Sequence, residues 1–238
     1  MRLVLSCLLV ASTVGATDLI VRQRASAGAG ATPREETVYL AGDKIATDAP
    51  NARTIVDLAA KTITSIDLAK RTYTVLTFDD LTAQMDAIKK SIDSLPPEAR
   101  KQLGALFSDG EAVTVRATGK TEQIAGYAAN EYALAGGAYS GAVWSTDAIP
   151  TPTEFQKWKG LEQSNGGAGR RLGEAMAQIK GFPLRTRIEI KTGGPSIVIS
   201  NEVIDVKEGP PPNGMLHVPA GFTKQAASTV PPGGAPPH

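Results

Sequence analysis

The chain has few of the residues that most often carry reactive chemistry. It contains one cysteine, Cys7, and two histidines, His217 and His238. Because Cys7 lies in a segment that we expect to be removed, we expect no disulfide, thiolate metal site or redox pair in the mature chain. Two histidines are too few for a histidine metal cluster, and a Ser-His-Asp triad would depend on His217 alone. We therefore expect no metal and no cofactor.

An excess of charge of either sign is also missing. The 25 basic and 24 acidic residues leave a net charge of +1. Such a chain offers no general basic surface for nucleic acid or for an anionic membrane, so we expect neither as a partner. Aromatic residues are 5% of the total and there are 24 glycines, which predicts a modest core with many turns.

The N-terminal segment has the pattern of a cleavable signal peptide. Arg2 precedes an apolar run over residues 3–14, and small or branched residues lead to Ala16. The run is too short for a transmembrane helix, which needs about 20 apolar residues. We predict a signal peptide over 1–16, cut after Ala16, and a periplasmic or secreted protein. Acylation at Cys7 is the alternative, although cleavage there would leave a very short export segment.

A ten-residue repeat is the most informative pattern in the chain. Residues 55–64 align with residues 65–74 through the shared sequence Asp-Leu-Ala-x-(Lys/Arg)-Thr-x-Thr. This period fits one strand and one tight turn, and the alternation of its last residues fits a sheet with one buried face. The repeat predicts an antiparallel meander. Further strands are expected at 18–24, 37–40, 111–116, 122–127, 130–134, 141–146, 184–191 and 196–207, with a register shift near Asn201.

Two helical insertions are expected to interrupt the strands. The first carries an apolar stripe, begins near a cap at Asp79, Asp80 or Thr82, ends at Pro96 and continues as a second helix over 98–107. The other insertion has one helix from Thr153, with an apolar side, then a linker over 165–169 and a helix over 170–180 that Gly181 ends. The apolar residues that we take as candidate ligand contacts are Met85, Ile88, Ile92, Phe155 and Trp158. A dry core would use the same side chains, so both interpretations stay open.

Catalytic motifs fail on inspection. Lys191-Thr192-Gly193 matches one serine β-lactamase box, but the chain has no Ser-x-x-Lys. The glycines around Ser140 are not placed as a nucleophile elbow requires. Adjacent carboxylates such as Asp79 and Asp80 point to opposite faces of a strand or cap a helix. We predict that the protein is not an enzyme and name no catalytic residue, although a hydrolase built from distant carboxylates stays possible.

The order of short motifs along the chain resembles a bacterial exported family of unknown function, and its layout is similar to that of the LolA/LolB-like lipoprotein carriers. The segments that carry the resemblance are 38–44, 55–58, 61–63, 70–73, 124–127, 143–146 and 204–222. The resemblance implies an α+β fold in which a curved antiparallel sheet, an open half barrel, has helical insertions packed on its concave face. Carriers of this fold hold acyl chains between sheet and helices.

These observations lead to three functional hypotheses. The first is a non-enzymatic envelope protein, one domain over 17–225 with a disordered tail over 226–238, that binds a hydrophobic ligand or a lipidated or apolar segment. Its partner would be a lipid or lipoprotein. The second is a periplasmic scaffold or adaptor without a ligand cavity, which recruits partners through exposed strands and the Pro-rich tail. The third is a hydrolase that uses carboxylates alone. The sequence does not identify an oligomeric state.

Overall fold

The computed structural model describes residues 18–28, 30–96, 112–150, 155, 167–191 and 195–226, apart from the side chains of 167–169. Several predictions concern the rest of the chain: the signal peptide over 1–16, the helix over 98–107, the helix that follows Thr153, and all of the tail beyond residue 226. These predictions lie outside the described residues. Within them, no helix is both long enough and apolar enough to cross a membrane.

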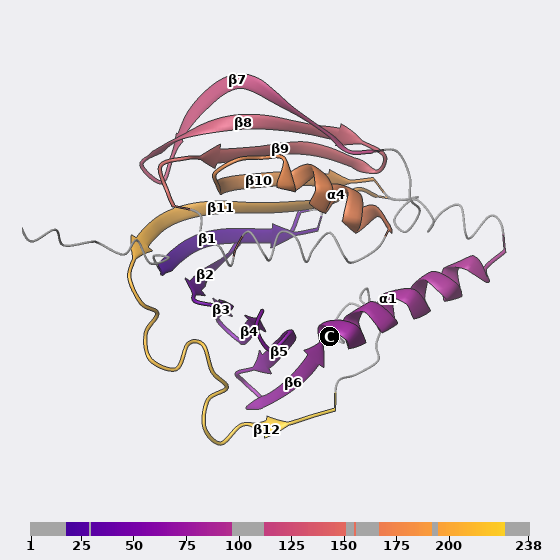
Figure 1. The fold of residues 1–238 in the computed structure, drawn as a ribbon, viewed down its shortest axis with the longest axis vertical. Helices are drawn as coiled ribbons and strands as arrows, with labels where there is room; N and C mark the ends of the chain where they lie inside the picture. Colours follow the sequence, from indigo (N-terminus) through magenta and orange to yellow (C-terminus); the bar gives the residue numbers. More distant parts are fainter. Residues whose placement is uncertain are drawn as a thin grey trace, which may run out of the picture.

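The described residues form one open sheet of twelve strands with two helices, α1 and α4 (Figure 1). Neighbouring strands are antiparallel except for the short last strand, which pairs in parallel with β6. In sheet order the strands are β12 (Thr223–Lys224), β6 (Thr72–Thr77), β5 (Thr62–Asp67), β4 (Ala52–Asp57), β3 (Lys44–Ala49), β2 (Arg34–Ala41), β1 (Leu19–Ala27), β11 (Ile197–Glu208), β10 (Phe182–Ile190), β9 (Tyr139–Thr146), β8 (Tyr127–Gly136) and β7 (Thr114–Ile124). The prediction of a mainly antiparallel sheet is confirmed, and helices are a minor part of the fold.

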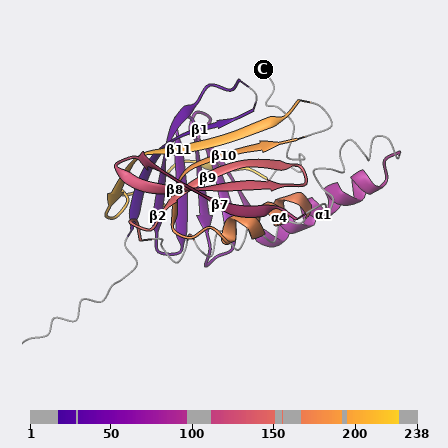
Figure 2. The same cartoon turned by 90° about the horizontal axis from the view of Figure 1, so that it is seen from above.

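The sheet changes direction between β1 and β2. The axes of strands β7 to β11 lie side by side with one common tilt. The axes of β2 to β6 lie across them in both views (Figures 1 and 2). The right-handed twist of strands accumulates into such a bend when a sheet has many strands. Two halves of one sheet therefore face each other across an interior space.

The ten-residue repeat forms the hairpin turns that the sequence predicted. Asp57 and Asp67 occupy equivalent places, and each carboxylate accepts a hydrogen bond of 2.8 Å from the backbone N–H three residues later. Lys61 and Arg71, also equivalent, have φ angles of 54° and 56°, the left-handed conformation that ends each turn. The local side-chain hydrogen bond favours this turn over a continued strand. Asp, Lys/Arg and Thr recur because each occupies a fixed place in the turn.

Two strand predictions differ from the structure. Residues 111–116 and 122–127 were expected as separate strands, but β7 is continuous over Thr114–Ile124 and contains a register break between Ala117 and Thr121. A bulge of this kind looks like a turn in the sequence because it contains glycine and polar residues. The break in β11 lies at Ile204, where Arg22 pairs with Asp205 and Gln23 with Val203, rather than at Asn201.

Helix α1 (Phe78–Asp93) follows β6 directly and begins earlier than expected. Its cap is Thr77, whose hydroxyl accepts from the Asp80 N–H at 3.0 Å while the Asp80 carboxylate accepts from the Thr77 N–H at 3.0 Å. This reciprocal capping box corrects the expectation of a cap at Asp79, Asp80 or Thr82. The strand of the sheet that α1 chiefly contacts is β6, the neighbour of the edge strand β12. The resemblance implied a helix packed on the concave face of the sheet. Helix α1 does not lie there.

Helix α4 (Gly167–Ala177) begins inside the segment that was expected to be a linker. Its buried Ala175, together with Ile179 beyond its end, packs on strands β7 to β10, against residues that include Val143 and Ile188. Tertiary burial of this apolar stripe outweighs the low helix propensity of the glycines at its start. Gly181, at a φ of +79°, then turns the chain into β10.

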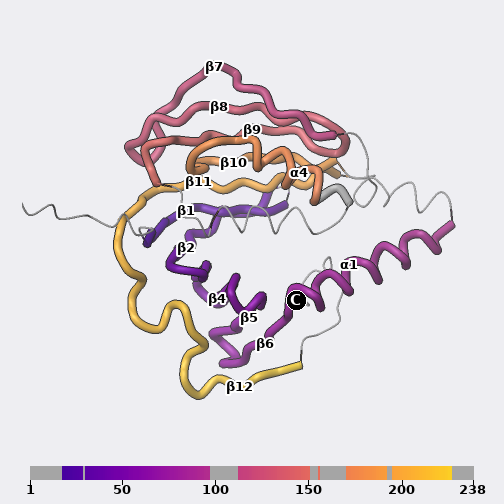
Figure 3. The backbone as a smooth tube through the Cα atoms, viewed as in Figure 1, coloured from indigo at the N-terminus to yellow at the C-terminus, as the bar shows by residue number. Residues whose placement is uncertain are grey.

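The C-terminal strap, residues 209–226, covers the outer face of the half of the sheet formed by β2 to β6 (Figure 3). Apolar side chains of the strap pack on outward-facing residues of β2 to β6, and the strap ends as β12. Arg53, buried under the strap, donates from Nε to Asp48 at 2.7 Å and from a terminal nitrogen to the Gly214 carbonyl at 3.1 Å. Both faces of β3 and β4 are therefore buried.

Candidate functional site

A cavity of about 690 Å³ lies between the two halves of the sheet and α4. This volume is in the range of small-molecule sites, about 300–1,000 Å³. Its lining comes from strands β1 to β5, β10 and β11, from α4 and from Phe155. The lining residues are Val21, Gln23, Val38, Leu40, Ile45, Thr47, Thr54, Val56, Ile63, Phe155, Leu172, Gly173, Met176, Phe182, Pro183, Leu184, Arg185, Thr186, Ile188, Asn201 and Val203.

One row of cross-strand neighbours forms an apolar floor. Leu40 pairs with Ile45, Ile45 with Val56, and Val56 with Ile63, so their side chains lie on one face of β2 to β5. Leu40, Ile45 and Val56 are buried, whereas Ile63 is half-buried. Directly opposed side chains in an antiparallel pair lie about 4.5–5.5 Å apart at Cβ, which makes the row continuous.

Polar side chains follow the floor in the next rows and form a diagonal band. Thr47 and Thr54 are directly opposed on β3 and β4, Gln23 lies on β1, and Asn201 and Thr186 are directly opposed on β11 and β10. All five are half-buried. The band crosses the sheet diagonally. In a curved sheet the strands are tilted, so residues at the same depth in the cavity lie on a diagonal across the strands. Beyond it, Ile188 is buried against α4.

A largely covered carboxylate, that of Glu36, lies next to the band, directly opposed to Gln23 on β2. Gln23 donates from Nε2 to Glu36 Oε1 at 2.7 Å. The Glu36 side chain is 9% exposed, and the nearest cation is Arg34, whose Nε is 3.8 Å away on a side chain that is 71% exposed. Within the described part of the chain, Asn201, Thr186, Thr47 and Thr54 have no side-chain hydrogen bond. Their donors and acceptors face the cavity.

The structure brings together only part of the predicted site. Phe155 lines the cavity and contacts the Phe182 ring at 5.5 Å between centroids. Met85 and Ile88 are half-buried and Ile92 is 8% exposed, but all three lie on α1 and are not among the lining residues. Trp158 lies outside the described residues. Whether any of the five binds a ligand stays a prediction.

Sequence reasoning missed the strand residues that line the cavity. Their signal was alternation: Leu40, Ile45, Val56 and Ile63 recur on the same face of successive short strands. The alternation shows which residues share a face. It does not show which face borders a cavity, because the opposite residues Tyr39, Ala46, Ile55 and Ile66 are buried as well.

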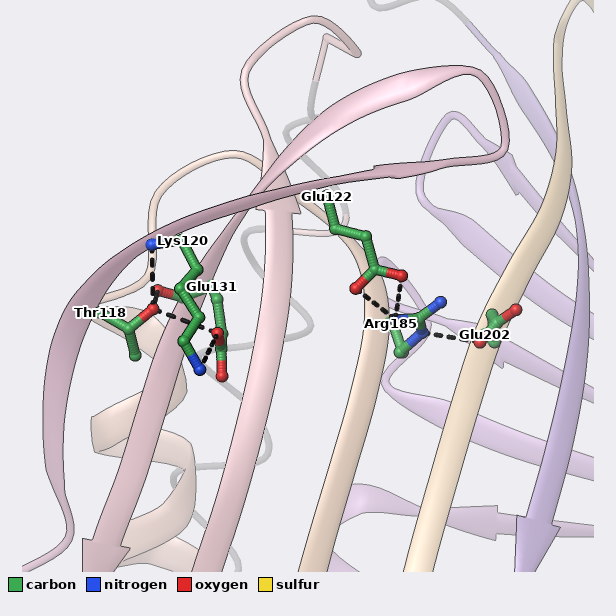
Figure 4. Close-up of polar contacts among 6 residues, drawn as sticks. All are labelled: Thr118, Lys120, Glu122, Glu131, Arg185 and Glu202. Carbon is green, nitrogen blue, oxygen red and sulfur yellow. Dashed lines mark hydrogen bonds and ion pairs between the residues drawn. The ribbon is translucent and has the colours of Figure 1, made fainter.

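Charged residues gather instead on the outer face of the half of the sheet formed by β7 to β11 (Figure 4). Arg185 donates to Glu122 at 2.8 Å and to Glu202 at 2.6 Å, and its guanidinium lies over the Trp144 ring. Partial burial lowers the pKa of Arg185, but the hydrogen bonds to Glu122 and Glu202 outweigh it and raise that pKa. The group is a fixed cation at any physiological pH.

A second set of polar contacts lies nearer the edge strand (Figure 4). Glu131 on β8 accepts from the Thr118 hydroxyl at 3.2 Å and lies 3.6 Å from the Lys120 ammonium. Both sets pair opposite charges across strands, which stabilises an exposed sheet face. The described residues show no cluster of three His, Cys, Asp or Glu side chains that could hold a metal ion.

Comparisons with known proteins describe the family but not the activity. No curated protein shows significant similarity to the chain. Two structures of PNGF-II, in space groups C2 and P21, align with TM-scores of 0.40 and 0.39 at 11% and 12% identity, over 89% of this chain. The chain spans 31% and 32% of those proteins, and at such scores the alignment carries no inference.

A family profile matches residues 43–222, about three quarters of the chain. The matched region runs from the turn before β3 into the C-terminal strap, so it includes α4 and every residue of the apolar floor except Leu40. The expectation of an uncharacterised family is confirmed, while the similarity to LolA and LolB stays a prediction. The chain belongs to the DUF4412 family, a family of domains of unknown function.

Proposed function

We propose that this protein is an exported, non-enzymatic envelope protein that binds a hydrophobic ligand in the cavity between its sheet and α4. One observation carries the proposal: a cavity of about 690 Å³ whose floor consists of Leu40, Ile45, Val56 and Ile63. Apolar space that water fills poorly is the property that lets a protein take up an acyl or alkyl chain.

The chemistry of the lining favours binding over catalysis. Arg185 is the one titratable side chain among the described lining residues, and Glu122 and Glu202 hold its guanidinium on the outer face. A general acid or base needs a proton that it can exchange near the operating pH. The same pairing argues against a hydrolase built on Glu122 and Glu202, because an arginine separates these two carboxylates.

The energetics set a minimum size for the ligand. Each buried methylene contributes about 0.8 kcal/mol. Association costs about 4–15 kcal/mol in lost freedom of motion. Burial therefore exceeds the cost at about 5–19 methylenes, and a dodecyl chain lies near the middle of this range. We expect short alcohols and acids to bind too weakly to detect.

The resemblance to LolA/LolB-like carriers adds a cellular setting to the proposal. In that setting the curved sheet acts as the half barrel, α4 covers part of its opening, and a lipid or the acyl group of a lipoprotein occupies the space. The signal-peptide pattern over 1–16 supports a periplasmic or secreted location for this activity. The scaffold alternative needs a filled interior, and the cavity therefore favours the carrier hypothesis over it.

The test is binding of a neutral apolar fluorophore, N-phenyl-1-naphthylamine, to the protein purified from the periplasm. We expect saturable enhancement of its fluorescence, and co-purified lipid in an organic extract examined by mass spectrometry. Val38→Trp fills the cavity from β2 and is expected to abolish both signals. Thr37→Trp, the adjacent residue with its side chain on the other face, is the control. Absence of both lipid and fluorophore binding would disprove the proposal.

A further inference from the structure

We propose that the ligand of this cavity is an amphiphile with one uncharged hydrogen-bonding group, such as an alcohol, ester or amide, held at the polar band. This inference rests on the proposed function and specifies its ligand. It begins from a contrast within the lining: the floor from Leu40 to Ile63 offers no hydrogen bond from its side chains, whereas Asn201, Thr186, Thr47 and Thr54 do.

The band has the composition of a binding surface rather than of a packed core. Buried polar side chains are normally satisfied within a protein. Here a hydroxyl pair on β3 and β4 and the Asn201–Thr186 pair on β11 and β10 are half-buried, face the cavity and have no side-chain hydrogen bond among the described residues. A pure hydrocarbon would cover these groups without replacing the water that they bind, and this desolvation is unfavourable.

The charges around the band select against an anionic head group. The Glu36 carboxylate lies next to Gln23 and is largely covered, so its field is poorly screened there. A second carboxylate in the band would repel it. Arg185, the cation among the described lining residues, is already paired with Glu122 and Glu202 on the outer face. An anionic head therefore gains no ion pair in the described lining.

A cationic head group is disfavoured because the Glu36 carboxylate already has partners. Its Oε1 already accepts from the Gln23 amide at 2.7 Å, and Arg34 lies 3.8 Å from Oε2. One carboxylate oxygen is therefore already occupied by the Gln23 amide and the other faces Arg34, which leaves a cation only a long-range attraction. An ammonium at the band would lose its water and would meet Gln23 first, without a direct ion pair in return.

The experiment compares head groups at constant chain length. Dodecanol, dodecanoate, dodecylammonium and dodecane are titrated against the full mature protein loaded with N-phenyl-1-naphthylamine. We expect dodecanol to displace the fluorophore at a concentration about tenfold lower than any of the others, the effect of one or two hydrogen bonds. A second measurement uses Asn201→Leu, which is expected to remove most of this preference: dodecanol loses its hydrogen bond, and dodecane binds more tightly because it no longer desolvates the amide.

The control is Ser200→Ala, on the same strand with its side chain on the opposite face, which is expected to leave all four affinities unchanged. Equal displacement by all four compounds would overturn the inference and leave the proposed function intact, because the cavity would then recognise the chain alone. Tighter binding of dodecanoate or dodecylammonium would overturn it also. Failure of the fluorophore and of all four compounds to bind would instead remove the proposed function.

Discussion

One buried guanidinium joins the C-terminal strap to the sheet, and its removal gives a sharp test of how this half of the fold is stabilised. The Arg53 side chain is 8% exposed, lies 2.7 Å from Asp48 and donates to the Gly214 carbonyl at 3.1 Å. Arg53→Met keeps an apolar stem of similar length but removes both hydrogen bonds. The substitution leaves Asp48 and the Gly214 carbonyl unpaired at a covered site.

The magnitude follows from burial. Loss of one partner of a fully buried ion pair costs about 3–5 kcal/mol, because the remaining charge is left uncompensated. The Asp48 side chain is 29% exposed, so water replaces part of the lost contact. We expect the free energy of unfolding to fall by about 2–4 kcal/mol, and the melting temperature by about 5–15 °C.

The assay is urea unfolding followed by circular dichroism, with amide hydrogen exchange on the folded protein. Exchange is expected to accelerate first at Thr223 and Gln225, whose amides donate to the carbonyls of Arg71, just before β6, and of Tyr73 on β6. Loss of the anchor frees the strap before the rest of the sheet unfolds.

The matched control is Arg22→Met, which removes a guanidinium 3.4 Å from Glu35 with both side chains about half exposed. Exposed pairs contribute about 0–1 kcal/mol. If the two substitutions change stability equally, the buried pair is not the anchor and the reasoning is wrong. Adding Asp48→Leu to Arg53→Met is expected to recover part of the loss, since it removes the unpaired charge.

Three further predictions concern the sheet and its turns. Gly141→Ala places a Cβ 2.1 Å from the Arg187 carbonyl oxygen, so we expect a loss of about 3 kcal/mol or more in urea unfolding. Lys61→Gly relieves a left-handed conformation that costs about 1–2 kcal/mol, less about 0.4–1 kcal/mol of unfolded-state entropy, and calorimetry should show a slightly higher melting temperature. Hydrogen bonds from Thr77 lower the pKa of Asp80, so its stabilising effect is complete above the ordinary Asp pKa and is lost as the pH falls through the lowered value. Asp80→Ala should therefore destabilise at neutral pH, and the difference from the unsubstituted protein should shrink in urea titrations below about pH 4.

The sequence determined the features that depend on neighbours along the chain. The repeat around Asp57 and Asp67 predicts hairpins because the carboxylate that begins each turn accepts a hydrogen bond from the N–H three residues later. The apolar stripe of α1 predicts a helix for the same local reason. Its true cap, Thr77, lies between the end of the repeat and the expected cap residues, because the last residue of β6 also caps the helix.

The tertiary structure decided where the cavity lies and what lines it. Leu40 and Tyr39 are both buried, one on the inner face and one under the strap, and their sequence alone does not distinguish the two faces. The contact between Arg53 and Gly214 joins positions 161 residues apart, and no local pattern specifies it. The polar band likewise comes from strands distant in sequence. Only the bend of the sheet brings these strands to the same cavity. Local chemistry thus set the strands and turns, and the long-range curvature of the sheet set the site.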